Sequence, residues 1–178
     1  MNETRRDISI PMSEAASKSL LIAIPTAVFQ AAPFFLIYGF PAIPNNSNIT
    51  VYGFLLLFGI LIHELIHMFA WVLFAKKSLR AFTLGFQWKS LAPYAHCKER
   101  MDIQPYRIGS FAPGFVLGVL PWFISLFTGD VLFFFYGLLY TTAASGDFLI
   151  MWILRNVKPN TLVEDHPINA GCYIIEQE

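Results

Sequence analysis

Two histidines and a glutamate interrupt an otherwise apolar stretch, "GILIHELIHMFAW", at positions 59 to 71. On an α-helix, His63 and His67 are four residues apart and lie on one face, so both imidazoles can bind one metal ion. Glu64 follows the first histidine and can reach a water at that metal ion. The spacing predicts a helical metal site with a general base next to it.

Two explanations other than a metal site could account for this His-Glu-x-x-His pattern. With four histidines in 178 residues, chance produces it in roughly one chain in a hundred or fewer. The simpler alternative is a pair of buried histidines that bind backbone or hydroxyl groups beside a protonated Glu64. However, an ionisable side chain in an apolar segment costs several kcal/mol unless it is paired or bound to a metal. We therefore favour zinc, bound as in HExxH peptidases.

A catalytic zinc ion has three protein ligands and one position for water, so a third ligand is needed. Apart from Asp130 at the first position of the fourth span, Asp147 is the only other acidic residue within the predicted spans, and Asp147 and His67 each lie about eight residues from the end of their span. This matching depth predicts Asp147 as the third ligand, and the small residues at 143–146 would let its helix approach the helix of the histidines. A structural acid that pairs with a neighbour or faces water is the alternative. Three residues outside the spans compete as third ligands: His96, Asp165 and His166.

The composition indicates which elements position these residues. The chain is 56% hydrophobic and only 13% charged, which is too apolar for an ordinary soluble domain. Two segments almost without charge each exceed the roughly 20 residues that a helix needs to cross a bilayer, and a turn divides each of them. We therefore predict an all-α polytopic membrane protein that forms one domain, 1–178, with four transmembrane helices at about 19–40, 50–75, 105–127 and 130–154.

Of the 12 lysines and arginines, 11 lie before the first predicted span, between the second and the third, or after the fourth, and Arg107 lies at the start of the third. The positive-inside rule therefore places both termini, the loop 76–104 and the tail 156–178 in the cytosol. The expected partner is the lipid bilayer, and no basic pattern indicates nucleic-acid binding. Cys97 and Cys172 both fall in segments that the topology places in the reducing cytosol, so we expect no structural disulfide. A nucleophilic pair of His96 and Cys97 is disfavoured because adjacent residues of an extended segment point to opposite faces.

The loop between the second and third spans has large apolar residues at every second position, at Phe82, Leu84, Phe86 and Trp88. This period of two, followed by a turn near 90–93, predicts a short cytosolic β-hairpin at the membrane surface. The edge of the hairpin could hold an extended substrate by backbone pairing, or its aromatic residues could anchor it among the headgroups. The tail 156–178 has no helical period. It could form a lid, a docked strand or a disordered terminus.

Several longer motifs resemble those of a known family. They are "HELIH" at 63–67, "YAHCKE" at 94–99, "YRIGSFAPGFVLGVLP" at 106–121, "SGD" at 145–147 and the tail stretch "EDHPINAGCYI". Through them the chain resembles the "Putative zincin peptidase" family of small bacterial membrane proteins and, more broadly, the site-2-protease class of intramembrane zinc metalloproteases. The resemblance implies His63, His67 and Asp147 as Zn²⁺ ligands and Glu64 as the catalytic glutamate. It also implies a multi-pass protein of the bacterial cytoplasmic membrane that cleaves membrane-associated protein or peptide substrates near the cytosolic side.

The chain departs from the site-2-protease pattern at two places. Those proteases commonly have glycine before the second motif histidine, where this chain has Ile66, and an asparagine-proline stretch before the aspartate, where it has "TTAASGD". The asparagine that would help to hold the substrate or the oxyanion is missing, and Thr141, Thr142 and Ser145 are the remaining candidates. The alternative function is a non-hydrolytic metal-binding membrane protein, either an inactive protease relative or a transporter. A haem-binding pair of spans is disfavoured, because two histidines at i and i+4 cannot lie on opposite faces of one haem.

Overall fold

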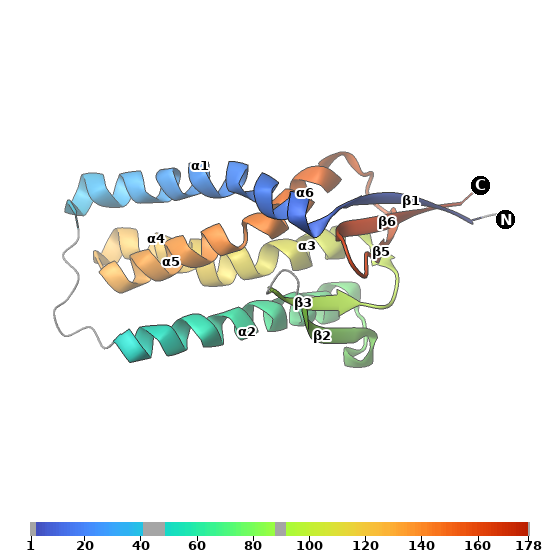
Figure 1. The fold of residues 1–178 in the computed structure, drawn as a ribbon, viewed down its shortest axis with the longest axis horizontal. Coiled ribbons are helices and arrows are strands. Elements are labelled where there is room, and N and C mark those ends of the chain that lie inside the picture. Colours follow the sequence, from blue (N-terminus) through green and yellow to red (C-terminus); the bar gives the residue numbers. More distant parts are fainter. Residues whose placement is uncertain (1–2, 41–48, 88–91, 178) are drawn as a thin grey trace.

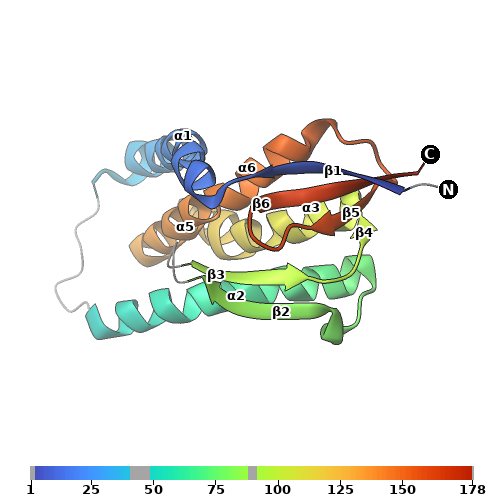
Figure 2. The same ribbon diagram turned by 45° about the vertical axis from the view of Figure 1, so that its right-hand side comes forward.

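The described part of the chain, residues 3–40, 49–87 and 92–177 of a computed structural model, is an elongated helical bundle with its strands at one end (Figure 1). Its helices are α1 (Met12–Tyr38), α2 (Ile49–Ala75), α3 (Ile103–Pro113), α4 (Leu120–Thr128), α5 (Val131–Ala143) and α6 (Ser145–Ile153), with the 3₁₀ turns η1 (Leu79–Ala81) and η3 (Leu154–Asn156) and the π-helix η2 (Gly114–Val119). In two views α1 and α2 are the outer helices, α3, α4 and α5 lie between them, and α6 continues from α5 toward the end that carries the strands (Figure 1, Figure 2).

Three helical segments are each long and apolar enough to cross a membrane: Met12–Tyr38, Gly53–Ala75 and the continuous stretch Ile103–Thr128. A fourth span would combine α5 with α6 and η3, which are bent by 42° where they meet. The predicted spans thus coincide with four helical segments, and the fourth is broken rather than straight. The 27 residues of α1 extend about 40 Å, which is more than the roughly 30 Å hydrocarbon core of a bilayer.

The third span contains the π-helix η2 between two prolines. Pro113 ends α3, and Pro121 lies in the first turn of α4. Proline has no backbone N–H, so Pro121 leaves a carbonyl one turn earlier without its usual α-helical donor. A wider turn, in which each carbonyl accepts from the residue five positions ahead, accommodates that loss.

A four-stranded antiparallel sheet covers one end of the bundle, in the order β1-β6-β5-β4. Its strands are β1 (Glu3–Ile10), β4 (Met101–Asp102), β5 (Leu162–Asp165) and β6 (Ala170–Gln177). The all-α prediction with a single hairpin is therefore incomplete, because β1 and the tail supply a second sheet. β1 pairs with β6 from Glu3 opposite Gln177 to Ile10 opposite Ala170. Of the three possibilities for the tail, the structure shows docked strands.

The predicted hairpin between the second and third spans is confirmed. β2 (Phe82–Gln87) and β3 (Ala92–Cys97) pair antiparallel, from Phe82 opposite Cys97 to Gln87 opposite Ala92. Trp88 and the first half of the predicted turn, 90–91, lie outside the described residues, and positions 92–93 already belong to β3. In both views the hairpin lies beside α2, at the end of the bundle that also carries the four-stranded sheet (Figure 1, Figure 2).

A cluster of buried apolar side chains joins the hairpin, the four-stranded sheet and the adjacent ends of α2 and α3. Its members include Trp71 of α2, Phe82 of β2, Ile103 of α3, Val163 of β5 and Ile174 of β6. Burying one aliphatic or phenyl side chain of this size contributes about 1.5–3 kcal/mol. The cluster therefore fixes both sheets against the helices that carry the candidate site.

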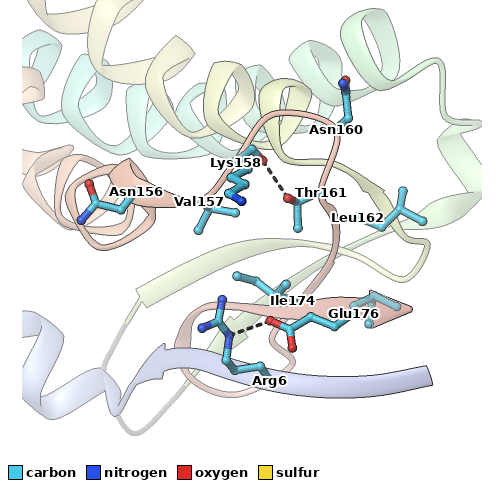
Figure 3. Close-up of a pocket in the computed structure, with 10 residues that line it drawn as sticks. Arg6, Asn156, Val157, Lys158, Asn160, Thr161, Leu162, Ile174 and Glu176 are labelled. Atoms are coloured by element: carbon cyan, nitrogen blue, oxygen red, sulfur yellow. Dashed lines mark hydrogen bonds and ion pairs between the residues drawn. The ribbon is translucent and has the colours of Figure 1, made fainter. Parts of the chain in front are cut away.

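A cavity of about 580 Å³ lies between the segment that follows α6 and the strands β1 and β6 (Figure 3). Arg6 and Lys158 contribute cationic side chains to its lining, and Arg6 pairs with Glu176 at 3.1 Å. None of the residues that the sequence predicts for the metal site lines this cavity. The chemistry predicted for those residues therefore belongs to a different part of the fold.

Candidate metal centre

The candidate centre lies between α2 and α6. His63 and His67 project from one face of α2, and Asp147 lies in the first turn of α6. His63 Nε2 is 3.1 Å from Asp147 Oδ2, and His67 Nε2 is 3.4 Å from Asp147 Oδ1. One donor atom from each residue lies within 4.8 Å of the other two. The structure thus brings together the three residues that spacing and depth single out.

The second ring nitrogen of His67 has a fixed partner. His67 Nδ1 lies 2.9 Å from the carbonyl oxygen of Gly109 on α3. A carbonyl oxygen can only accept, so Nδ1 carries the proton, and Nε2 is left with the lone pair that a metal ion needs. The Trp71 ring also stacks on the His67 ring, with centroids 5.6 Å apart. Both contacts hold the imidazole toward Asp147.

Glycine is required at position 109 for this contact. A Cβ there would collide with the indole of Trp71, which lies directly against the Gly109 backbone. The Trp71 Nε1–H in turn donates to the carbonyl of Tyr106 at 3.3 Å. The small residue at position 109 therefore serves the orientation of His67.

Glu64 approaches the centre from the next position of α2. Its half-buried carboxylate interacts electrostatically with His63, His67 and Asp147 and with the backbone N–H of Ala95 on β3. Strand β3 therefore runs beside the glutamate that the sequence predicts as the base. Sequence reasoning missed Ala95, because a backbone donor leaves no mark in the residue type.

The family is decided by a comparison of sequences. Residues 54–162 match the family model described as "Putative zincin peptidase". The chain belongs to this family. The match includes α2 with both histidines, the hairpin and Asp147, and membership supports a metallopeptidase and implies zinc as its metal. No curated protein and no solved structure matches the chain.

The three candidate ligands fit the metal that the zincin family implies. Imidazole nitrogen and carboxylate oxygen are common zinc ligands, at about 2.0–2.2 Å from the ion. Tetrahedral angles then put neighbouring ligand atoms about 3.3 Å apart. Asp147 Oδ2 lies 3.1 Å from His63 Nε2 and Asp147 Oδ1 lies 3.4 Å from His67 Nε2, so each histidine nitrogen already has a carboxylate oxygen at about this separation.

The competing third ligands lie away from the centre. His96 Nδ1 is 2.9 Å from Asp165 Oδ2, so these two residues bind each other. His166 Nδ1 accepts backbone hydrogen bonds from Ile168 and Asn169, at 3.1 and 2.7 Å. Within the described residues, the one group of histidine, cysteine and acidic side chains that could hold a metal is His63, His67 and Asp147.

Two of the hydroxyls considered for the oxyanion have other partners. Thr141 Oγ1 donates to Gly137 O at 2.8 Å and accepts from Gln30 Nε2 at 2.9 Å. Thr142 Oγ1 donates to the carbonyl of Leu138 at 2.8 Å. Both hydroxyls therefore satisfy carbonyls of their own helix, and their role here is packing of α5. Ser145 is buried at the start of α6.

The small residues before Asp147 do not bring α6 against α2 as expected. α6 packs mainly on α1 and α3. Ala144 lies against Gly114, and the space where a side chain of Gly146 would lie is open. The contact with α2 is therefore made by the Asp147 carboxylate rather than by close backbone packing.

The cysteines do not provide a nucleophile. Cys97 and Cys172 are both free and buried. The Cys97 thiol donates to Glu99 O at 3.3 Å, while the His96 ring binds Asp165 instead of the sulfur. Burial raises the pKa of the Cys97 thiol above its ordinary value, so the reactive thiolate is disfavoured.

Proposed function

We propose that this chain is an intramembrane zinc metalloprotease that hydrolyses a peptide bond of membrane-associated protein or peptide substrates. His63, His67 and Asp147 hold Zn²⁺, and Glu64 is the general base. The observation that carries the proposal is the convergence of two imidazoles and one carboxylate from separate helices, with Glu64 beside them. Membership of the zincin family supports both the metal and the reaction class.

The apolar surface supports a location in the bilayer. Large apolar side chains on the outer helices face away from the protein, among them Leu21 at 76% and Leu36 at 86% exposure on α1 and Phe54 at 71% on α2. A soluble protein rarely exposes apolar patches of this extent, whereas lipid would cover them. We place the protein in a bacterial cytoplasmic membrane as a multi-pass protein. The sheets then lie in the cytosol with both termini, where the positive-inside rule puts the basic loop.

The chain's own residues have separate parts in the reaction. A zinc ion held by the three ligands would acidify water and polarise the scissile carbonyl. Glu64 takes a proton from the attacking water and delivers it to the leaving amine, because its carboxylate lies next to the ligands. The Gly109 carbonyl keeps His67 in the tautomer that can bind a metal.

Strand β3 is the element that would hold the substrate. Its backbone runs beside Glu64, and in the two-stranded sheet it has only β2 as a strand neighbour. An extended peptide could therefore pair with the outer edge of β3 by backbone hydrogen bonds. Such pairing would place a peptide bond near Glu64 through contacts that do not depend on the side chains of the peptide.

The replacement Glu64→Gln tests the proposal. It removes the base and leaves the three ligands, so zinc content should stay at about one ion per chain while cleavage disappears. New protein N-termini would be labelled and identified by mass spectrometry in membranes that contain wild type, Glu64→Gln or the control Glu99→Gln, whose side chain is exposed and pairs with Lys77. Identical N-termini in wild type and Glu64→Gln, with zinc bound in both, would instead favour the non-hydrolytic metal-binding protein.

A further inference from the structure

A second polar cluster lies outside the metal centre and centres on Asp165 of β5. Its Oδ2 atom accepts from the His96 ring at 2.9 Å and from the backbone N–H of Cys97 at 3.2 Å. Its Oδ1 atom accepts from the hydroxyl of Tyr106 on α3 at 2.9 Å. The carboxylate is 11% exposed. One side chain of the tail thus ties the hairpin to the third span.

The partner of Asp165 is a histidine whose protonated form the carboxylate favours. The hydrogen bond to Asp165 raises the pKa of His96 above its ordinary value of 6.5, although burial opposes the shift. Lys98 also opposes the shift, and Glu164 reinforces it. Among the described residues, no lysine or arginine pairs with Asp165. His96, which belongs to β3, is therefore the side chain that can balance the charge of the buried carboxylate.

The register of the hairpin gives this cluster a direct connection to Glu64. The Lys98 N–H donates to Ala81 O at 2.8 Å, so in the antiparallel ladder every second residue of β3 points its N–H at β2. Ala95 and Cys97 are the residues in between, and their N–H groups point to the outer edge. The Cys97 N–H donates to Asp165, and the Ala95 N–H faces the Glu64 carboxylate.

These two donors are two residues apart on a rigid strand, about 6.6 Å along it. Whatever fixes Cys97 therefore also fixes Ala95. We propose that Asp165 is a positioning residue of the site, which holds β3 so that the Ala95 N–H meets Glu64 and which closes the outer edge of β3 at Cys97. The inference rests on the peptidase function proposed above for its effect on hydrolysis, but not for its effect on β3.

The closed edge also sets where a substrate strand can lie. Asp165 occupies the outer N–H of Cys97, so backbone pairing with a peptide cannot extend past that residue. Pro93 has no N–H and the Ala95 N–H faces Glu64, so the carbonyls of Pro93 and Ala95 remain on the outer edge to accept from a substrate backbone. The tail thus limits the length of peptide that pairs on β3.

Hydrogen–deuterium exchange resolved to single amides tests the proposal in Asp165→Ala and Asp165→Asn. The control is Glu164→Gln on the same strand, which removes an equal charge from a side chain that pairs with Arg5 and Arg100. Exchange at Ala95 and Cys97 should rise about tenfold or more in Asp165→Ala, the change expected when a hydrogen bond to a charged group is lost. Asp165→Asn, which keeps one acceptor oxygen, should show a smaller rise, and Glu164→Gln none.

Zinc content and kinetics separate positioning from general damage to the fold. Zinc should remain at about one ion per chain, while kcat for a fluorogenic peptide built on an identified cleavage site falls about 10–100-fold. KM should change far less than kcat. Unchanged exchange at Ala95 in both variants, or unchanged kcat despite faster exchange, would overturn the proposal. If Asp165→Ala loses its zinc and its fold, the exchange at Ala95 and the kcat of Asp165→Asn decide whether Asp165 positions β3. A wild type that cleaves nothing contradicts the peptidase function, and the exchange data then still decide whether Asp165 holds β3.

Discussion

Replacement of Asp147 by asparagine isolates the contribution of the third ligand. Asparagine keeps the size of the side chain and one carbonyl oxygen, but it removes the negative charge that lies 3.1 and 3.4 Å from the two histidines. α6 has few other contacts with α2, so no packing contact can replace the carboxylate. We therefore expect Asp147→Asn to weaken zinc binding without unfolding the bundle.

The size of the effect follows from comparison with residues that only support a ligand. Loss of such a supporting residue lowers metal affinity by about 10–100-fold. Asp147 would itself be a ligand, so we expect a loss of at least about 100-fold. At about 1.4 kcal/mol for each factor of ten, this corresponds to about 2.8 kcal/mol of binding free energy.

Competition with a chromophoric zinc chelator at pH 7, on detergent-purified protein, measures this difference. The matched control is Asp130→Asn, because Asp130 caps α5 by accepting from the N–H groups of Leu132 and Phe133 and asparagine caps a helix equally well. The control should bind zinc like wild type. An affinity of Asp147→Asn within about threefold of wild type, which is under 1 kcal/mol, would refute the assignment of Asp147 as a ligand.

Two further predictions concern the surroundings of the centre. Folding raises the pKa of His96 above 6.5, so its stabilisation of the hairpin is complete below pH 6.5 and is lost as the pH rises through the raised value. Thermal unfolding of His96→Gln, measured against pH, should lack this part of the pH dependence. A pH profile identical to that of wild type would contradict the pairing with Asp165. Gly109→Ala should destabilise the fold by about 1–3 kcal/mol, because its Cβ would displace the Trp71 indole; an unfolding temperature equal to that of wild type would show that this contact is not tight.

The parts of the site that follow a local period could be predicted from the sequence. His63 and His67 lie together because a helix repeats every 3.6 residues, and the matching depths of two helices were enough to single out Asp147. The hairpin was visible in its period of two. Backbone partners such as Gly109 O and the Ala95 N–H could not be found in this way, because any residue offers the same groups.

The second sheet was missed for a different reason. β1 contains several charged residues, and it becomes a strand because it pairs with β6, whose residues lie more than 150 positions away in the chain. No local pattern reports such a pairing, since strand formation depends on the partner as much as on the segment itself. The same holds for Asp165, whose three donors belong to the distant elements β3 and α3.

The central claim is that His63, His67 and Asp147 hold one zinc ion, and X-ray absorption at the zinc edge tests it most directly. On wild-type protein reconstituted with zinc, the account predicts about one ion per chain with nitrogen and oxygen ligands at about 2.0–2.2 Å and the outer-shell scattering of two imidazoles. Failure to bind zinc after reconstitution would contradict it. So would a sulfur ligand at about 2.3 Å, which would point to Cys97 or Cys172 instead.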